Sequence, residues 1–256
     1  MAWTMESNGT IREWRAKNGT DILFPETELR FGDKLKLRGG APVCVPNFGD
    51  APTDGPYTGI QLPKHGLVRD CRIDAEGKRS ARNTCCQQTP PQVDEDGRVS
   101  TGFLFTHPWT HDVWVSAEEE EVRGHTQLHH RISVGIEQIE DDGMPCSVGF
   151  HPYFATHDDA FSLFYKDERW GVNDLEVDKS FFVPHRYDEK FLIATSRGDV
   201  EIELKSGYGG YYVWTDKPDR YICVEPVTDF WGERYRILNP GELLDCECVL
   251  TYTPND

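Results

Sequence analysis

The chain lacks a long apolar run. No stretch of its 256 residues approaches the roughly 20 consecutive apolar residues that a membrane-spanning helix needs. The first residues, Met1 to Glu6, also lack the basic start and apolar stretch of a secretory signal peptide. We therefore expect a cytoplasmic protein that has no membrane partner.

Basic residues are in the minority, with 27 Lys and Arg against 44 Asp and Glu, a formal net charge of -17. A polyanion would be repelled by this charge, which argues against a nucleic-acid partner. We expect most of the surplus acid to form a solvated surface. An anionic substrate would need a local basic cluster, and one is provided by Arg38, Lys64, Arg69 and Arg72.

The eight cysteines include no Cys-x-x-Cys pair, the spacing typical of structural zinc sites. Cys44, Cys146 and Cys223 lie in apolar runs, where a thiol behaves as a small hydrophobic group. Adjacent or alternating cysteines, as in Cys85-Cys86 and Cys246-x-Cys248, rarely form a metal site unaided. We expect free structural thiols.

A second metal hypothesis concerns the histidines between His107 and His130. Zinc needs three or four convergent ligands, but the alternation of a strand would direct His129 and His130 to opposite faces. We predict neither a metal nor another cofactor.

Hydrophobicity alternates with a period of two rather than 3.6, which is typical of strands. The alternation is visible in four segments, 127–134, 199–204, 211–214 and 247–252. Turn pairs separate such segments, including Asn8-Gly9, Asn18-Gly19, Asp96-Gly97, Asp142-Gly143 and Ser206-Gly207. The polar stretch from Arg79 to Arg98 is typical of an exposed hairpin or mobile loop. The length suits one mostly β domain over residues 1–256.

Two ionisable residues stand alone in apolar or aromatic runs. His151 lies in Gly-Phe-His-Pro-Tyr-Phe and Glu225 in Cys-Val-Glu-Pro-Val-Thr. A buried charge costs free energy unless it is paired or has a function, so each residue is a candidate for a functional site. For either one alone, the alternative is a hydrogen-bonded core residue. A histidine that donates a proton and a glutamate that accepts one can perform general acid and base catalysis together.

With two further segments, Arg38-Gly-Gly-Ala-Pro-Val-Cys-Val-Pro-Asn-Phe-Gly49 and Leu62-Pro-Lys-His-Gly-Leu-Val-Arg69, these motifs resemble the galactose mutarotase-like superfamily. Within it, the chain is similar to the hexose-6-phosphate mutarotases, also called glucose-6-phosphate 1-epimerases. The resemblance runs from about Trp14 to about Tyr252, with further matches at 109–112 and 238–242. It implies an all-β supersandwich of two large twisted antiparallel sheets, with a sugar site over one sheet.

The resemblance also implies roles for single residues. Glu225 would be the base on the anomeric hydroxyl and His151 the acid on the ring oxygen. His65 would hydrogen-bond the sugar or its ring oxygen, and a loop histidine that only caps a turn is the alternative. Arg38 and Arg69 match the arginines that hold a 6-phosphate. Asp188 matches loosely an acidic residue that binds a sugar hydroxyl, and a solvated loop charge is equally consistent with its position. Residues 109–112 would begin a strand that borders the groove, with a packing role.

The expected function is interconversion of the α and β anomers of a hexose 6-phosphate, and the expected partner is a small sugar or sugar phosphate. Two alternatives stay open: a mutarotase for an unphosphorylated hexose, and a carbohydrate-binding protein without turnover. The intact pair of His151 and Glu225 argues against the second alternative. We expect a monomer or weak homodimer.

Overall fold

The computed structural model describes residues 3–51, 59–71, 86–138, 143–157, 161–186, 188–229 and 236–255. Regular structure in these ranges is almost entirely β. The strands are β1 (Trp3–Met5), β2 (Ile11–Trp14), β3 (Thr27–Phe31), β4 (Lys34–Arg38), β5 (Val43–Cys44), β6 (Cys86–Val93), β7 (Val99–Phe105), β8 (Thr110–Val122), β9 (His125–Gln138), β10 (Met144–Cys146), β11 (Gly149–Phe150), β12 (Tyr153–Ala155), β13 (Phe161–Tyr165), β14 (Glu168–Gly171), β15 (Phe181–Pro184), β16 (Phe191–Thr195), β17 (Gly198–Ser206), β18 (Gly210–Trp214), β19 (Tyr221–Val227), β20 (Arg236–Leu238) and β21 (Leu243–Pro254), and the 3-10 helices are η2 (Val68–Asp70) and η3 (Val172–Asp174).

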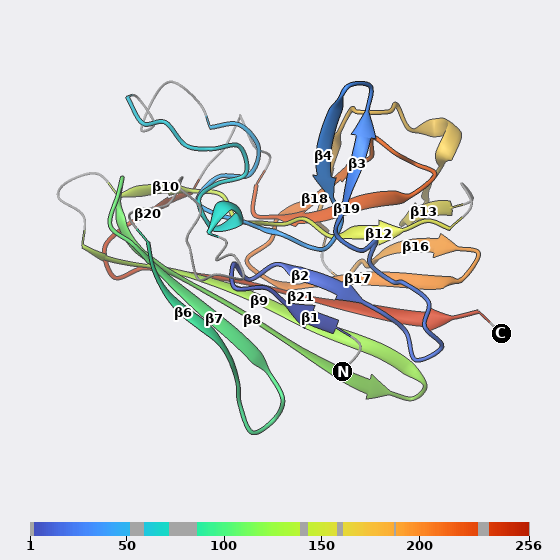
Figure 1. Ribbon diagram of the computed structural model, residues 1–256, viewed down its shortest axis with the longest axis horizontal. Coiled ribbons are helices and arrows are strands. Elements are labelled where there is room, and N and C mark those ends of the chain that lie inside the picture. The colour runs from blue at the N-terminus through green and yellow to red at the C-terminus, as the bar shows by residue number, and fades with distance from the viewer. Residues whose placement is uncertain are drawn as a thin grey trace.

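Two antiparallel sheets dominate the described residues. The larger has nine strands in the order β14-β13-β16-β17-β21-β9-β8-β7-β6. The smaller has six, in the order β15-β18-β19-β11-β5, with β12 also paired to β19. Figure 1 shows the long strands β6 to β9 and β21 below β12, β18 and β19. The architecture confirms the expected β supersandwich.

The core lies between the two sheets because each contributes one apolar face. In β9, Leu128, Ile132 and Val134 are fully buried, while the intervening residues His129 and Arg131 reach solvent. Burial of each such aliphatic side chain stabilises the fold by about 1.5–3 kcal/mol. The ring of His130 joins this face and stacks on Phe150 of β11, with 3.8 Å between ring centroids. The apolar residues of the period-two pattern in β9 are therefore the ones that the structure buries, and the intervening residues His129 and Arg131 face solvent.

The expected strands and turns are largely confirmed. All four alternating segments lie within strands, namely β9, β17, β18 and β21. The pairs Asn8-Gly9, Asp96-Gly97 and Ser206-Gly207 connect consecutive strands, and their glycines have positive φ. Asp142 lies outside the described residues. Of the polar stretch from Arg79 to Arg98, the part from Cys86 onward forms β6 and the following turn, and the rest lies outside the described residues.

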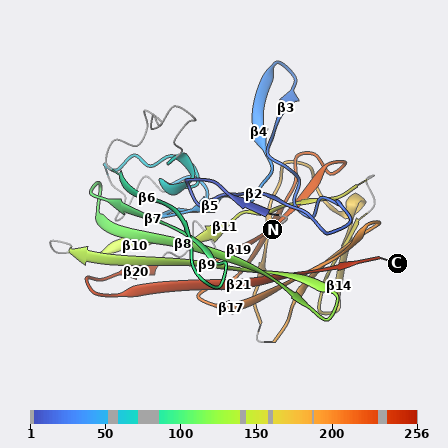
Figure 2. The ribbon, with the colours of Figure 1, turned by 60° about the horizontal axis from the view of Figure 1, so that its bottom comes forward.

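A two-stranded hairpin of β3 and β4 stands out from the sandwich (Figure 2). Leu35 and Leu37 of this hairpin are exposed, which fits its position outside the core. Arg38 is the last residue of β4, so the hairpin ends at one of the expected site residues.

Within the described part of the chain, no helix has the length and apolar character needed to cross a bilayer.

Candidate active site

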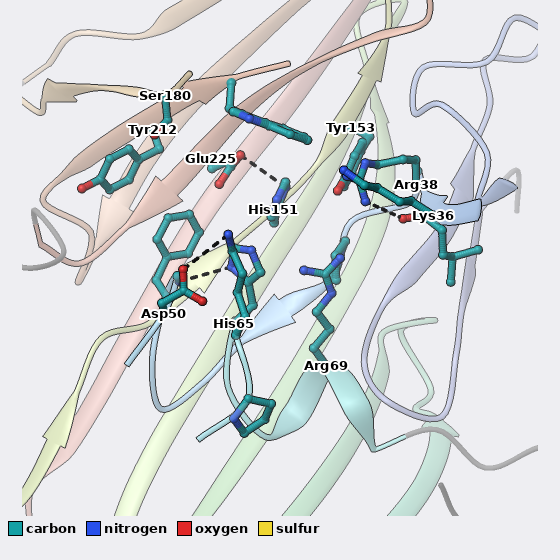
Figure 3. A pocket seen from close by; sticks show the side chains of 18 of the residues that line it. Lys36, Arg38, Asp50, His65, Arg69, His151, Tyr153, Ser180, Tyr212 and Glu225 are labelled. Carbon is teal, nitrogen blue, oxygen red and sulfur yellow. Dashed lines mark hydrogen bonds and ion pairs between the residues drawn. The ribbon is translucent and has the colours of Figure 1, made fainter. Parts of the chain in front are cut away.

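A cavity of about 1260 Å³ lies over the smaller sheet and collects five of the six expected site residues. Figure 3 shows His151 and Glu225 at its centre, with Arg38 and Arg69 to one side and His65 below. The cavity volume exceeds that of a typical small-ligand pocket, about 300–1,000 Å³. The cavity is therefore large enough for a small ligand of sugar size.

His151 and Glu225 form a buried pair. Nδ1 of His151 lies 3.4 Å from Oε1 of Glu225, and the side chains are 5% and 3% exposed. Glu225 comes from the middle of β19, where it stands opposite Tyr212 of β18. His151 lies between β11 and β12, where its backbone N–H donates to the carbonyl of Pro42. Segments 74 residues apart in the sequence thus bring one imidazole and one carboxyl group together.

Burial shifts both groups toward their neutral forms. It raises the pKa of Glu225 well above its ordinary value, against the attraction of Arg69 and Lys64. It lowers the pKa of His151 well below its ordinary value, and the positive field of His65, Arg69 and Arg38 adds to this. A raised pKa makes the carboxylate a stronger base, and a lowered pKa makes the imidazolium a stronger acid. The two side chains titrate as a pair that shares one proton at intermediate pH.

His65 is held in a strained loop. Its φ is 66°, and that of Gly66 is 80°. A Cβ on Gly66 would lie 2.2 Å from the carbonyl oxygen of Val45, so only glycine fits at this position. Burial, followed by the charges of Arg69, Lys64 and Arg38, lowers the pKa of His65 to about 3.

The neutral imidazole of His65 has a defined tautomer. Its Nδ1 accepts a hydrogen bond from the backbone N–H of Gly49 at 3.2 Å. The ring proton must therefore be on Nε2. The ring also makes an edge contact with His151, at 5.4 Å between centroids. His65 can thus donate a hydrogen bond without carrying a charge.

Arg38 is already paired within the protein. Its Nη2 and Nε donate to Oδ2 of Asp216 at 2.8 and 3.2 Å, and its Nη1 donates to the carbonyl of Leu37. Asp216 is 4% exposed in its side chain and also accepts from the hydroxyl of Tyr221. Three of the five guanidinium N–H donors are used in this way. Arg38 therefore offers two donors to a ligand, and most of its charge is balanced.

Arg69 differs from Arg38 because its guanidinium has no ion pair with any of the described residues. It belongs to η2, and its backbone carbonyl accepts from Nδ2 of Asn8 at 2.9 Å. The side chain extends into the cavity between His65 and Arg38 (Figure 3). Lys64 lines the mouth and pairs with the exposed Asp50 at 3.6 Å. Arg72, the fourth member of the expected basic cluster, lies outside the described residues.

The aromatic wall of the cavity was not expected from the sequence. Phe48 stacks on Tyr212 at 5.3 Å, and Tyr153 stacks on His151 at 4.8 Å with parallel rings. Trp214 stands edge-on to His151 at 6.1 Å. Tyr212 and Trp214 are two residues apart on β18, so both side chains point to the same face of the sheet. The period-two pattern of this strand could have indicated that they lie together. Asp216 gave no such signal, because its role depends on Arg38.

Two expectations about the site need correction. Asp188 does not line the cavity: it is an exposed residue with φ of 65° in the connection between β15 and β16. Of the segment 109–112, Thr110 does begin a strand, β8, but that strand belongs to the nine-stranded sheet and contributes no residue to the cavity lining. Neither Asp188 nor the segment 109–112 is among the residues that line the cavity.

Among the described residues, the group that could hold a metal ion is His151, Cys223 and Glu225, with one ligand atom of each within 4.8 Å of the others. The expected histidine cluster is different: His129 pairs with Glu120 on the outer face, whereas His130 is buried in the core. The predicted divergence of these two side chains is confirmed. The described cysteines are buried thiols that form no disulfide with one another.

No protein-family model matches the chain. One curated relative is a protein of Cenchrus ciliaris that is named, as a provisional assignment, glucose-6-phosphate 1-epimerase. It is 27% identical over 161 residues, which cover 59% of this chain and 42% of the relative. The match thus spans less than half the length of that relative.

Solved structures resemble the chain over almost its whole length. A protein of Synechocystis sp. PCC 6803 matches with a TM-score of 0.68 and 19% identity, covering 99% of this chain and 91% of that one. A galactose mutarotase related enzyme from Lactobacillus acidophilus matches with a TM-score of 0.67 and 16% identity, covering 98% and 94%. A galactose mutarotase-like protein from Lactobacillus casei matches with a TM-score of 0.64 and 14% identity, covering 98% and 96%. The chain therefore has the fold of the galactose mutarotase-like proteins, as its motifs indicated.

Proposed function

We propose that the protein is a mutarotase that interconverts the α and β anomers of a hexose 6-phosphate. The observation that carries the proposal is the buried pair of His151 and Glu225 at the centre of a sugar-sized cavity, with 3.4 Å between Nδ1 and Oε1. Both oxygens that change protonation in anomer exchange are bonded to one carbon, C1. An acid and a base that serve them must converge closely, as these two do.

Burial favours the form of the pair with its proton on Glu225, so the proposed reaction proceeds from the minor form in which that proton is on His151. In this form the Glu225 carboxylate takes the proton of the anomeric hydroxyl, and the C1–O1 bond becomes a carbonyl. The C1–O5 bond breaks, its electron pair goes to O5, and protonated His151 gives O5 its proton. Rotation about C1–C2 exposes the other face of the aldehyde. Ring closure then returns one proton to His151 from O5 and one from Glu225 to O1. Each proton transfer contributes about 10²- to 10⁴-fold in rate.

Neighbouring groups support these steps. His65 is neutral with its proton on Nε2, which suits a hydrogen bond to the sugar. The rings of Tyr153, Trp214 and Tyr212 provide apolar faces against which a sugar ring packs. The pathway needs no cofactor, because two side chains account for both protons.

The phosphate part of the proposal is supported by four cationic side chains in the cavity lining, Lys36, Arg38, Lys64 and Arg69, in a chain of net charge -17. Arg69 is the strongest candidate, since its guanidinium has no ion pair with the described residues. The curated relative from Cenchrus ciliaris points to the same substrate class by its name.

An unphosphorylated hexose is the second candidate substrate. The observation that favours it is the pairing of Arg38 with Asp216, which balances a charge that the phosphate would otherwise meet. The effect of replacing Arg69 on the use of each sugar therefore distinguishes the two candidate substrates.

The test of the catalytic assignment is anomer exchange, measured by NMR saturation transfer with glucose 6-phosphate and with glucose. Glu225→Gln keeps size and hydrogen bonding, and His151→Asn keeps a hydrogen-bonding group, but both prevent proton transfer, so each should lower the rate by about 10²-fold or more. The fold, followed by circular dichroism, should persist.

A matched control pair lies on the outer face of the other sheet. His129 and Glu120 are 2.9 Å apart there, outside the cavity. His129→Asn and Glu120→Gln make the same chemical changes and should leave the rate unchanged. Retention of most activity by either cavity variant would remove that residue from the mechanism. If the unmodified protein exchanges no anomers, the non-catalytic sugar-binding alternative is favoured.

A further inference from the structure

Cys223 lies next to the catalytic pair but has no part in the proposed reaction. It stands two residues before Glu225 on β19, so both side chains project from the same face of the strand. Its cross-strand neighbours are Tyr153 on β12 and Trp214 on β18. Cys223 itself is fully buried beneath the cavity lining. The thiol is thus at the floor of the site.

The ligand atoms of His151, Cys223 and Glu225 lie within 4.8 Å of one another. Tetrahedral zinc with bonds of about 2.0–2.1 Å to nitrogen and oxygen places those two atoms about 3.4 Å apart. The observed distance between Nδ1 of His151 and Oε1 of Glu225 is 3.4 Å. A zinc-bound sulfur at about 2.3 Å would lie about 3.6 Å from the nitrogen. Cys223 therefore needs a shift of about an ångström at most.

A second observation points to a ligand at this place. Nδ1 of His151 is buried and has no hydrogen-bond partner among the described residues, although the carboxylate lies close by. A buried nitrogen lone pair or N–H without a partner is costly, and a bound cation would use the lone pair. Imidazole, thiolate and carboxylate together are a donor set that zinc accepts, whereas Mg²⁺ prefers oxygen alone.

We propose that His151, Cys223 and Glu225 form an inhibitory site for a soft divalent cation, of which Zn²⁺ is the representative. The cation binds through three protein ligands and keeps a fourth position open to the cavity. Binding displaces two protons to solvent, that of the thiol and the one that His151 and Glu225 hold between them, as the bonds from the metal to sulfur, nitrogen and oxygen form. The occupied site holds both the acid and the base of the proposed reaction, so the cation excludes proton transfer. Inhibition rests on the proposed mutarotase function, but cation binding does not.

Binding is tested first without any activity assay. Co²⁺ added to the metal-free protein should produce a thiolate-to-metal charge-transfer absorption, and Zn²⁺ should displace it with one equivalent per chain. Mg²⁺ should produce no change. Absence of the thiolate band in the unmodified protein overturns the proposal, and this readout needs no variant to fold.

Variants then identify the thiol. Cys223→Ser and Cys223→Ala should each abolish the charge-transfer band and weaken Zn²⁺ binding by about 10-fold or more, since even groups that only orient a ligand affect affinity 10- to 100-fold. The matched control is Cys248→Ser, a buried cysteine of β21 outside the cavity, which should bind Zn²⁺ as the unmodified protein does. Unchanged Zn²⁺ affinity in both Cys223 variants would overturn the assignment.

The activity measurement separates this proposal from the proposed function. In a protein with mutarotase activity, Zn²⁺ should inhibit at the concentrations at which it binds, and a chelator should restore the rate. Activity that is insensitive to bound Zn²⁺ contradicts the inhibitory role alone. A cobalt spectrum with thiolate character in a protein that exchanges no anomers upholds the site and rejects the mutarotase.

Discussion

Arg69→Met is the most informative single substitution for the substrate. Methionine keeps the length and apolar stem of the side chain while removing the guanidinium. Arg69 is half-buried, lines the cavity and has no ion pair with the described residues, so its charge is available to a phosphate. We expect poorer use of glucose 6-phosphate and almost unchanged use of glucose.

The magnitude follows from the contacts that a phosphate would make. A charge-assisted hydrogen bond contributes about 1.5–3 kcal/mol, and a unit charge at about 5 Å contributes about 3 kcal/mol at an effective dielectric constant of about 20. Selection of glucose 6-phosphate over glucose should therefore fall by about 10- to 150-fold.

Arg38→Met should behave differently, because its charge is already balanced by Asp216 at 2.8 Å. Removal of Arg38 leaves a carboxylate that is 4% exposed without its cation, which costs about 3–5 kcal/mol of stability. Its main effect should be on the urea midpoint rather than on sugar selection. The two arginines are equivalent in the sequence motif, but we expect the Arg69 variant to change sugar selection and the Arg38 variant to change stability.

The assay compares kcat/KM for the two sugars by saturation transfer or polarimetry, for both arginine variants and for Arg131→Met. Arg131 is an exposed arginine paired with Asp245 on the nine-stranded sheet, outside the cavity, and serves as the control. An unchanged ratio in Arg69→Met would refute the reasoning. Equal processing of both sugars by the unmodified protein would leave the neutral-hexose mutarotase.

Three further predictions concern stability, the His65 loop and metal dependence. Burial lowers the pKa of His130 to about 3, so between pH 6.5 and 3 the unfolded chain binds a proton that the folded one does not, and stability falls as the pH falls. His130→Phe should remove about 2 kcal/mol of this loss between pH 6.5 and 5, as measured by urea unfolding, and an unchanged pH slope would contradict the assignment. Gly66→Ala should destabilise the protein and reduce activity, because its Cβ would meet the Val45 carbonyl, whereas Gly19→Ala, with a similar φ of 85° and open space, should cost only about 1–2 kcal/mol and leave activity intact. Prolonged chelation should not lower turnover, and a loss restored by one divalent ion would show that the reaction requires a metal.

Much of the fold and the centre of the site could be read from local sequence. The period-two alternation of segments such as 199–204 reflects one buried face, and burial of alternate residues is a local property of a strand. His151 and Glu225 were recognisable because an ionisable group in an apolar run needs a partner, whatever the fold. The φ of 80° at Gly66 is a conformation that glycine adopts without strain, so this turn too depends on a local property of the sequence.

Other features arose only from through-space proximity. Asp216 lies 178 residues from Arg38, and nothing near either residue indicates that the carboxylate takes up the charge of the guanidinium. The basic motif predicted two equivalent phosphate ligands, but the tertiary structure distinguishes them, because Coulomb energy depends on distance and burial rather than on residue type. The position of Asp188 was likewise decided by the tertiary structure. Its acidic character was visible in the sequence, but β15 and β16 pair with different sheets, and this directs the loop between them away from the cavity. The ionisable groups were present in the sequence, and the packing of the two sheets decided which of them meet.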